Sequence, residues 1–252
     1  MNNTKRFSNR AENYARYRPG YPAGIIPYLQ NSIQLNSSKM VADIGAGTGI
    51  SSALFLKEGN TVYGVEPNDA MREKAELFLQ HYPHFHSVRG TAEATHLPDS
   101  SVDLILAGQS FHWFNQEATK VEFKRIAKPD AYIVIMWNVR ELNTDFAKAY
   151  EHLLATYGRD YSADGRDVAS EHKTTSFFYP CAFEKVTFSR KEELSYEVLK
   201  GRLLSTSFVP AEDEEDCMPM MATLDDIFDR YQEDGKVSFD YTTTLYIARA
   251  HC

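Results

Sequence analysis

Three glycines at alternate positions, Gly45, Gly47 and Gly49, constrain the fold of this chain more than any other feature. Residues 40–44, which come directly before them, form an apolar run with one acid, Asp43, and this run predicts a buried parallel strand. A helical pattern begins directly after the third glycine. A strand, a glycine turn and a helix bring backbone close to a ligand and present N–H groups at a helix start. The stretch therefore predicts a cofactor site, although a turn that only joins strand to helix is the plainer interpretation.

The spacing of these glycines bears on the class of cofactor. The dinucleotide fingerprint G-x-G-x-x-G, aligned on Gly45 and Gly47, needs its third glycine at position 50, where the sequence has Ile50. The actual pattern, D-x-G-x-G-x-G, resembles the first motif of class I methyltransferases that use S-adenosylmethionine. An acid at Asp43 would repel a pyrophosphate, whereas it suits the sulfonium and ammonium groups of S-adenosylmethionine. The motif thus favours a cationic cofactor over a dinucleotide.

The length and charge of the chain limit the classes of protein to consider. For 252 residues we expect one large α/β domain with a cap rather than two independent domains. The net charge of −8, with no clustered run of lysine and arginine, disfavours electrostatic binding to nucleic acid. No apolar segment approaches the roughly 20 residues of a membrane-spanning helix, and the N-terminus lacks the apolar core of a secretory signal. We therefore expect a cytoplasmic protein without a membrane partner.

The three cysteines, Cys181, Cys217 and Cys252, are odd in number and have no C-x-x-C spacing. Such a count is typical of reduced cytosolic thiols rather than of a disulfide framework or a metal site. The sequence also has no H-E-x-x-H motif and no clustered aspartate pair that suggests a metal. We therefore predict an activity that is independent of metal.

Strands and helices alternate regularly through the first half of the chain. The predicted strands are residues 40–44, 61–65, 85–89, 102–108 and 132–137. Asn68 is a good N-cap for a helix after the second strand, and another helix is expected around residues 117–127. Alternation at these intervals predicts right-handed crossovers and a parallel sheet, which makes the fold class α/β.

The rest of the chain departs from this rhythm after Asn138. We expect helices at 144–157, 196–205 and 223–233, strands at 183–189 and 237–249, and a polar, loop-like stretch at 158–180. Helices inserted on one side of a sheet usually build a substrate cap. The predicted parts of the single domain are a lid and first helix at 1–33, a cofactor-binding core at 34–138, and cap insertions with an antiparallel sheet edge at 139–252.

Residues 1–20 are polar but carry aromatic side chains, among them Phe7, Tyr14 and Tyr17. A segment of this kind is too polar for a core, yet its aromatic side chains need a surface to cover. A lid over the cofactor is one interpretation, and a surface arm is the other. Arg18 adds a cation whose forked guanidinium suits the carboxylate of the cofactor or of a substrate, unless it makes only a surface salt bridge.

Polar residues follow several of the predicted strands, at the edge where open parallel sheets bind ligands. Glu66 could accept hydrogen bonds from both ribose hydroxyls of an adenosine, or it could be a solvated acid at a helix start. Glu93 could accept a hydrogen bond from an adenine amino group. His112 could be a general base for an acidic O–H or N–H group, or it could line the pocket as a packed aromatic ring.

Four segments, in this order, carry a family resemblance: VADIGAGTG, YGVEPNDAM, GTAEATHLPDSSVDLI and QSFHWF. Together they are similar to the methyltransferase type 11 group of class I S-adenosylmethionine-dependent methyltransferases, over about residues 40–138. The F-x6-Y-x2-YRPGYP segment and the FHWF stretch are similar to trans-aconitate methyltransferases and their relatives. The resemblance implies a Rossmann-like, seven-stranded, mostly parallel sheet of order 3-2-1-4-5-7-6. Strand 7 would be antiparallel, with helices on both faces of the sheet and a helical cap.

The resemblance also implies which residues bind S-adenosylmethionine and its product S-adenosylhomocysteine. Those near the methionyl part and the sulfonium would be Asp43, Gly45, Gly47, Gly49 and Gln109. Those near the adenosine would be Glu66 with its neighbours Pro67 and Asn68, and Met71, Ala92 and Glu93. Tyr17 and Arg18 would close over the cofactor from the lid.

The aromatic residues after the fourth and fifth strands argue for a small or medium-sized acceptor. The predicted substrate pocket contains Phe111, Trp113 and Trp137 with Phe114, and Phe177, Phe178 and Tyr179 are further candidates for it. His112 is the candidate catalytic residue. We predict methyl transfer to a small metabolite, for which a carboxylic acid is one candidate, by in-line displacement without metal. The alternatives are a non-catalytic module that binds S-adenosylmethionine or a partner, a dinucleotide-dependent oxidoreductase, and a nucleic-acid or protein acceptor. The chain could be a monomer or a homodimer.

Overall fold

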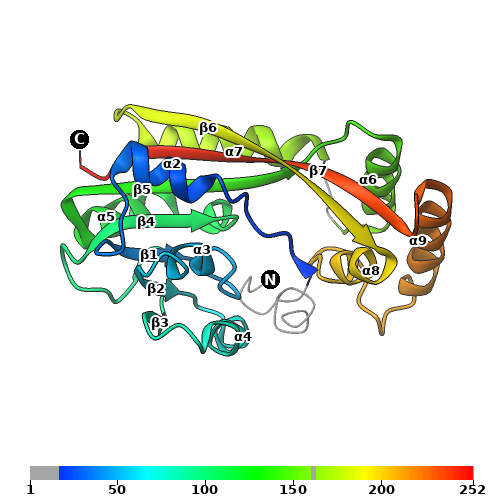
Figure 1. The fold of residues 1–252 in the computed structure, drawn as a ribbon, viewed down its shortest axis with the longest axis horizontal. Helices are drawn as coiled ribbons and strands as arrows, with labels where there is room; N and C mark the ends of the chain where they lie inside the picture. Colours follow the sequence, from blue (N-terminus) through cyan, green and yellow to red (C-terminus); the bar gives the residue numbers. More distant parts are fainter. Residues whose placement is uncertain (1–16, 160–162, 252) are drawn as a thin grey trace.

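A seven-stranded sheet with helices on both faces forms the centre of the molecule (Figure 1). The computed structural model describes residues 17–159 and 163–251. The strands are β1 (Met40–Ile44), β2 (Thr61–Val65), β3 (Phe85–Val88), β4 (Val102–Gly108), β5 (Ala127–Arg140), β6 (Phe183–Ser195) and β7 (Lys236–Arg249). Their order is β3-β2-β1-β4-β5-β7-β6, in which β1 to β5 pair in parallel and β7 is antiparallel to both neighbours. This confirms the fold class and the strand order that the resemblance implies.

The helices follow the strands in the alternation that the sequence predicts. They are α2 (Ile25–Ile33), α3 (Ser52–Leu56), α4 (Asp69–Leu79), the short 3-10 helix η3 (Phe111–Trp113), α5 (Gln116–Ile126), α6 (Asp145–Tyr157), α7 (Ala163–Phe178), α8 (Tyr196–Leu204) and α9 (Cys217–Tyr231). Asn68 caps α4, because its side chain accepts a hydrogen bond from the Met71 N–H at 3.0 Å. Thr144 caps α6 in the same way through the Ala147 N–H.

The two faces of the sheet belong to different hydrophobic clusters, as alternating side chains require. Val41, Leu104 and Val134 face α2 and α3 in one cluster. Ala42 and Ile105, which are next to them in the chain, face the other way in a second cluster that contains residues of α5 and α7. Both faces are covered, so β1 and β4 are apolar except for Asp43 and Asp103.

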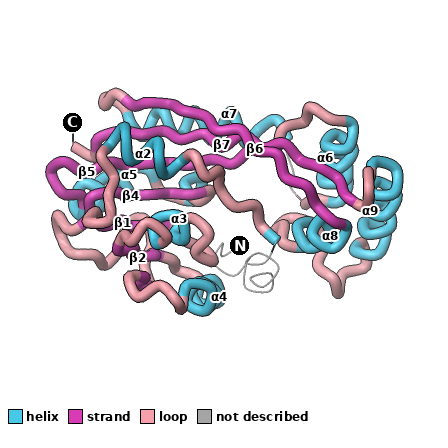
Figure 2. The backbone as a smooth tube through the Cα atoms, in the orientation of Figure 1, coloured by secondary structure: helices cyan, strands magenta, loops and turns pink. Residues whose placement is uncertain are grey.

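The antiparallel hairpin of β6 and β7 extends beyond the rest of the sheet. Residues 236–240 of β7 pair with β6 alone, whereas residues 241–249 also pair with β5. Helices α6, α8 and α9 pack around the extended part in a third hydrophobic cluster, which includes Tyr150, Leu199, Leu224 and Phe239. In Figures 1 and 2 these helices lie beyond the carboxyl end of β4. We call α6, α8 and α9, together with residues 236–240, the cap.

Several predicted boundaries differ from the structure. The prediction of a loop at 158–180 is wrong, because α7 occupies most of it. Few apolar residues mark this helix, and among its residues 171–178, whose burial the structure describes, Thr174, Phe177 and Phe178 are buried. Strand β6 and the end of β5 extend beyond the prediction because pairing with β7 holds their polar residues in the sheet, whereas β5 begins earlier through the pairing of Ala127 with Val102 of β4. Helix α9 begins at Cys217, ahead of the predicted residue 223.

The cysteines do not all match the sequence prediction. Cys181 is disulfide-bonded, so the prediction that it is a reduced thiol is wrong. Cys217 is a buried free thiol at the start of α9, as predicted. Cys252 lies outside the described residues.

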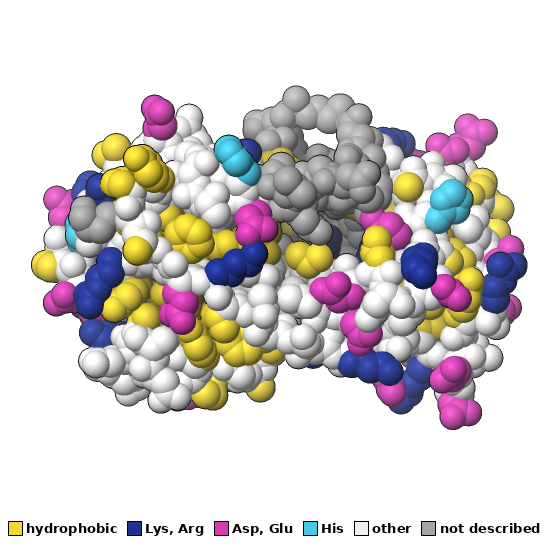
Figure 3. Space-filling view, turned by 90° about the horizontal axis from the view of Figure 1, so that it is seen from above, with side chains coloured by type: hydrophobic (Ala, Val, Ile, Leu, Met, Phe, Trp, Pro, Cys, Tyr) yellow, Lys and Arg dark blue, Asp and Glu magenta, His cyan; other side chains and the backbone are white. Residues whose placement is uncertain are grey.

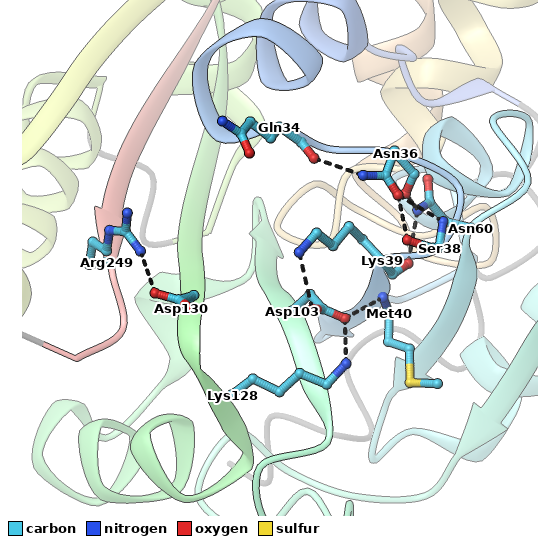
Figure 4. Close-up of polar contacts among 10 residues, drawn as sticks. All are labelled: Gln34, Asn36, Ser38, Lys39, Met40, Asn60, Asp103, Lys128, Asp130 and Arg249. Atoms are coloured by element: carbon cyan, nitrogen blue, oxygen red, sulfur yellow. Dashed lines mark hydrogen bonds and ion pairs between the residues drawn. The ribbon is translucent and has the colours of Figure 1, made fainter.

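Asp103 ties three strands together at the edge of the sheet where β1 and β4 begin (Figure 4). Its carboxylate accepts hydrogen bonds from the Met40 N–H at 2.9 Å and from Lys128 Nζ at 2.7 Å, and Lys39 Nζ lies 3.4 Å away. Burial raises the pKa of Asp103, but the hydrogen bonds from Lys128 and Met40 outweigh it, so the pKa lies below its ordinary value. The ionised carboxylate therefore stabilises this edge.

We expect Asp103→Ala to lower the free energy of unfolding at neutral pH by about 1–3 kcal/mol. Because the folded pKa is lowered, the stabilisation is present above the unfolded value near 3.9 and is lost as the pH falls. Urea unfolding at pH 7 and at about pH 3 should show the difference and its loss. Asp130→Ala, which removes an exposed partner of Arg249, is the matched control and should change the stability by less than about 0.5 kcal/mol. Equal losses in the two variants would contradict this account.

Candidate active site

The glycine loop, residues 45–49, lies at the carboxyl end of β1, and all three glycines have positive φ angles of 67°, 57° and 85°. A Cβ on Gly45 would lie 2.6 Å from Ser110 Cβ, and one on Gly49 would lie 2.6 Å from Leu79 Cδ1. A Cβ on Gly47 would have no described atom within 4 Å. Two of the glycines are therefore also required by packing, whereas Gly47 turns toward open space. A ligand can approach the backbone most closely at Gly47.

Asp43 lies beneath this loop and is fully buried. Its Oδ2 accepts hydrogen bonds from Ser51 Oγ at 2.6 Å and from Ser52 Oγ at 2.7 Å, at the start of α3. Its Oδ1 is buried without a hydrogen-bond partner in the described part of the chain. Burial raises the pKa of Asp43 to about 6, although hydrogen bonds from both serines lower it. A buried acceptor of this kind needs an explanation, and a hydrogen-bond donor on a ligand is one.

Glu66 connects the glycine loop to the next strand. Its Oε2 accepts a hydrogen bond from the Gly47 N–H at 3.0 Å, and its Oε1 accepts one from the Asn68 N–H at 2.9 Å. The side chain is nearly buried, and burial raises the pKa of Glu66 despite these two hydrogen bonds. The structure thus brings two predicted acids, Asp43 and Glu66, to the same loop.

The residues predicted for the adenosine follow β2 and β3. Met71 and Ala92 are buried, Asn68 is buried as the N-cap of α4, and Pro67 is half-buried. Glu93 Oε1 accepts a hydrogen bond from the Asn115 N–H at 2.8 Å, at the start of α5. The Glu93 side chain is therefore already held in place next to this part of the sheet edge.

Gln109 and Ser110 connect the end of β4 to its two neighbouring strands. Gln109 has a φ of 59°, and its Nε2 donates a hydrogen bond to the Asn138 carbonyl of β5 at 2.7 Å. Ser110 Oγ donates to the Ile44 carbonyl of β1 at 2.7 Å. These bonds fix the start of η3 next to the glycine loop.

The aromatic residues after β4 and β5 divide into a partly exposed group and a buried group. The His112 ring lies 4.5 Å from the Trp113 ring and 5.6 Å from the Trp137 ring, measured between centroids. Phe111 is 1% exposed and packs edge-on against Phe177 at 4.9 Å. Phe111, Phe177 and Phe178 therefore lie in the core, whereas Tyr179 is mostly exposed. The rings of His112, Trp113 and Trp137 are each partly exposed and form a wall that can be reached from outside, and Phe114 is half-buried against Phe111.

Tyr17 and Arg18 contact the cap. The Tyr17 carbonyl accepts a hydrogen bond from Arg202 Nε at 2.9 Å, and its hydroxyl donates to Glu197 at 3.3 Å. Arg18 Nη2 donates to the Ser205 carbonyl at the end of α8, at 3.4 Å. Phe7 and Tyr14, which belong to the predicted lid, lie outside the described residues.

Sequence reasoning missed three residues at this edge. Ser51 and Ser52 hold Asp43, and two consecutive hydroxyl residues, separated from the third glycine only by Ile50, are the signal that could have identified them. Tyr21 belongs to the YRPGYP segment, and its hydroxyl lies 2.7 Å from the position of a Cβ on Gly108. Tyr21 and Ser51 therefore both lie over the end of β4, which leaves room only for glycine there.

Other kinds of site find little support in the described residues. No group of three or more His, Cys, Asp or Glu side chains is placed to hold a metal ion within residues 17–159 and 163–251. Of the helices that the structure describes, none combines the length and the apolar character needed to cross a bilayer. On the face shown in Figure 3, the coloured basic side chains are interspersed with acidic ones and gather in no large patch.

Comparison with known proteins shows that this chain resembles methyltransferases in sequence and in fold. The family model described as a methyltransferase domain matches residues 42–135. An uncharacterized methyltransferase-like protein of Schizosaccharomyces pombe is 28% identical, over 96% of this chain and 94% of its own. A second uncharacterized methyltransferase of that organism is 26% identical over 95% of each chain. The structure of a putative type II methyltransferase from Anaeromyxobacter dehalogenans has a TM-score of 0.70 and 21% identity, and it covers 93% of this chain and 99% of the other.

Proposed function

We propose that this chain, which belongs to the class I S-adenosylmethionine-dependent methyltransferases of the type 11 group, transfers a methyl group to a small-molecule metabolite. The observation that supports this most strongly is the glycine loop. Gly47 turns toward open space, and the strand before the loop carries the buried carboxylate of Asp43, one oxygen of which has no hydrogen-bond partner in the described part of the chain. S-adenosylmethionine is an extended molecule that can lie against exposed backbone, and its ammonium group carries cationic N–H donors. Its sulfonium supplies an electrophilic methyl group.

The residues around the loop fit this cofactor in chemical terms. Asp43 Oδ1 can accept from an ammonium N–H, and a negative charge beneath the loop favours a cationic ligand. Glu66 carries two carboxylate oxygens, each with one backbone N–H, so each keeps a lone pair for a ribose hydroxyl. Pro67, Met71, Ala92, Glu93 and Gln109 are proposed as further cofactor contacts, as are Tyr17 and Arg18 from the cap side.

We propose the rings of His112, Trp113 and Trp137 as the wall of the acceptor site. Aromatic faces next to a sulfonium stabilise it by roughly 0.5–2 kcal/mol and exclude water. A carboxylate acceptor is already ionised at neutral pH, so methyl transfer to it needs alignment and no general base. A small carboxylic acid is therefore the first acceptor to test, and we assign His112 to the wall rather than to proton transfer.

Glu66→Ala should weaken the binding of S-adenosylhomocysteine by about 1–3 kcal/mol, because two ribose hydroxyls lose their acceptor. Titration calorimetry measures the change directly. Glu58→Ala removes an acid near the end of α3 that contacts only Gln30 among the described residues, and it should leave the affinity unchanged. An unchanged affinity in Glu66→Ala would remove this residue from the site.

A pH profile and two substitutions distinguish the two possible roles of His112, as part of the pocket wall or as a general base. With S-adenosylmethionine saturating and an acceptor acid identified by a metabolite screen, kcat should stay flat between about pH 6 and pH 8, since no imidazole titrates in the reaction. His112→Phe, which keeps an aromatic ring, should retain most of the activity, whereas His112→Ala should lose about tenfold. A profile that rises with an apparent pKa near 6.5, together with equal losses in the two variants, would instead make His112 a base.

A further inference from the structure

Arg140 is the last residue of β5 and lies at the same sheet edge as the proposed cofactor site. Asn138, two residues earlier, accepts the Gln109 side chain through its carbonyl and holds the Gly20 carbonyl through its own side-chain amide. Two residues of a strand span roughly 7 Å. Arg140 therefore lies one such step along β5 beyond Asn138, which contacts the proposed cofactor-binding residue Gln109. The described contacts of Arg140 all come from the cap and from Tyr241, its partner on β7.

The guanidinium of Arg140 is held by two buried rings and one carboxylate. Its centre lies 4.7 Å from the Tyr150 ring and 5.0 Å from the Phe239 ring, and its Nη2 pairs with Glu151. Its Nε is buried and has no hydrogen-bond partner in the part of the chain that the structure describes. Buried N–H groups without a partner are rare. The acceptor for the Arg140 Nε–H is therefore expected on a molecule other than the described chain.

Other arginines gather at the same place. Burial raises the pKa of Tyr150 to about 12, while the positive charges of Arg140, Arg202 and Arg18 oppose this rise. Arg202 is buried and pairs with Glu192, which also pairs with Arg190. Arg202 also donates to the Tyr241 hydroxyl at 2.8 Å, and Tyr241 is the β7 partner of Arg140.

These neighbouring guanidinium groups contrast with the net charge of the chain as a whole, which is −8. A buried guanidinium N–H without a hydrogen-bond partner is costly, and an anion that accepts from it removes that cost. The forked geometry of arginine, fixed in advance by stacked aromatic rings, suits a carboxylate. Glu151, which already pairs with Arg140, would compete with such an anion for the same guanidinium.

We propose that Arg140 binds a carboxylate of the methyl acceptor, so that the acceptor class is a small organic acid held between the cap and the end of β5. This inference rests on the proposed function, because it assumes that the bound anion is the methyl acceptor. The binding of a carboxylate at Arg140 can nevertheless be tested without methyl transfer. Arg140 is a binding residue in this account, and Glu151 keeps its guanidinium in place when the site is empty.

The test measures the binding of two carboxylates, phenylacetate and succinate, against their uncharged amides, phenylacetamide and succinamide. Ligand-observed nuclear magnetic resonance at low ionic strength gives each dissociation constant, with and without S-adenosylhomocysteine. At least one carboxylate should bind about tenfold or more tightly than its amide, and this preference should disappear in Arg140→Gln. Arg249→Gln is the matched control, because Arg249 also pairs with one aspartate and lies 4.7 Å from a tyrosine ring, but at the opposite edge of the sheet.

Two further variants separate binding from a purely structural ion pair. Glu151→Gln removes the competing carboxylate, so it should tighten carboxylate binding by about tenfold. The double variant Arg140→Gln/Glu151→Gln removes both charges, which avoids leaving a buried charge unpaired. It should fold, and it should bind the carboxylates no more tightly than their amides. Failure of both carboxylates to bind the wild type better than their amides, or discrimination that persists in the double variant, would overturn the proposal.

The outcomes also distinguish this inference from the proposed function. Carboxylate binding that depends on Arg140, in a protein that methylates nothing in a metabolite screen, would uphold the anion site and count against the enzyme. Methyl transfer to neutral acceptors, unaffected by Arg140→Gln, would uphold the enzyme and overturn the anion site.

Discussion

Gly47→Ala is expected to lower the affinity for S-adenosylhomocysteine by at least about 100-fold. The added Cβ would enter the open space into which the loop faces, where we place the ligand. The substitution also strains the backbone, because a φ of 57° costs a residue with a Cβ roughly 1–2 kcal/mol. Titration calorimetry of the purified variant gives the affinity, and thermal unfolding gives the stability.

The chain offers a matched control for this experiment at Gly235, in the turn before β7. Gly235 has a φ of 75°, and a Cβ there would also have no described atom within 4 Å. Gly235→Ala should therefore lose a similar amount of stability while it keeps full affinity for S-adenosylhomocysteine. Equal affinity losses in the two variants would show that strain alone, and not contact with the ligand, accounts for the effect.

Asp43→Asn is expected to stabilise the protein and, at the same time, to weaken cofactor binding. Burial raises the pKa of Asp43 from 3.8 to about 6, so the folded protein holds this proton more tightly than the unfolded chain. The stabilising contribution is therefore complete below the unfolded value and is lost as the pH rises through the folded value. Above about pH 6 the buried charge costs up to about 3 kcal/mol, and asparagine removes that cost.

The functional half of this prediction follows from the same charge. The affinity of the wild type for S-adenosylmethionine should rise as the pH increases through about 6, since ionised Asp43 favours a cation. Asp43→Asn should abolish this dependence and lower the affinity at pH 8 by about tenfold or more. Urea unfolding and calorimetry at pH 5 and pH 8 measure both halves.

Asp103→Asn is the natural comparison for Asp43→Asn, because the pKa of Asp103 is lowered rather than raised. The stability change should then have the opposite sign, with the cofactor affinity unchanged. A loss of stability in Asp43→Asn at pH 8 would mean that the two serine hydrogen bonds outweigh the burial of the charge.

The core of the fold could be predicted because its pattern is local. A five-residue apolar strand, a glycine turn and a helix leave few alternatives, and repeating that unit determines a parallel sheet. The cap at Asn68 follows from the same short-range chemistry, in which one side chain satisfies a backbone N–H three residues away. The carboxyl ends of parallel strands meet at one edge, so the gathering of Asp43, Glu66 and Gln109 also followed from the sequence.

The features that the sequence did not predict depend on contacts between residues that the fold brings together. Helix α7 has few apolar positions, and it is stabilised where Phe177 and Phe178 enter a core formed by η3, α5 and the sheet. The same packing took Phe111 out of the predicted pocket wall and into the core. The sequence does not predict the hydrogen bonds from Ser51 and Ser52 to the buried Asp43, because no periodicity identifies such a contact. Arg18, Arg140 and Arg202, whose charges act on Tyr150, come from the segment before α2, from β5 and from α8, so only the fold brings them together.

The central claim is that the glycine loop binds S-adenosylmethionine, and one calorimetric experiment tests it most directly. The wild-type protein is titrated with S-adenosylhomocysteine and, separately, with NAD, and both titrations are repeated with Gly47→Ala. We expect saturable binding of S-adenosylhomocysteine at one site per chain, no heat from NAD, and loss of the first signal in the variant. Binding of NAD without binding of S-adenosylhomocysteine would contradict the account.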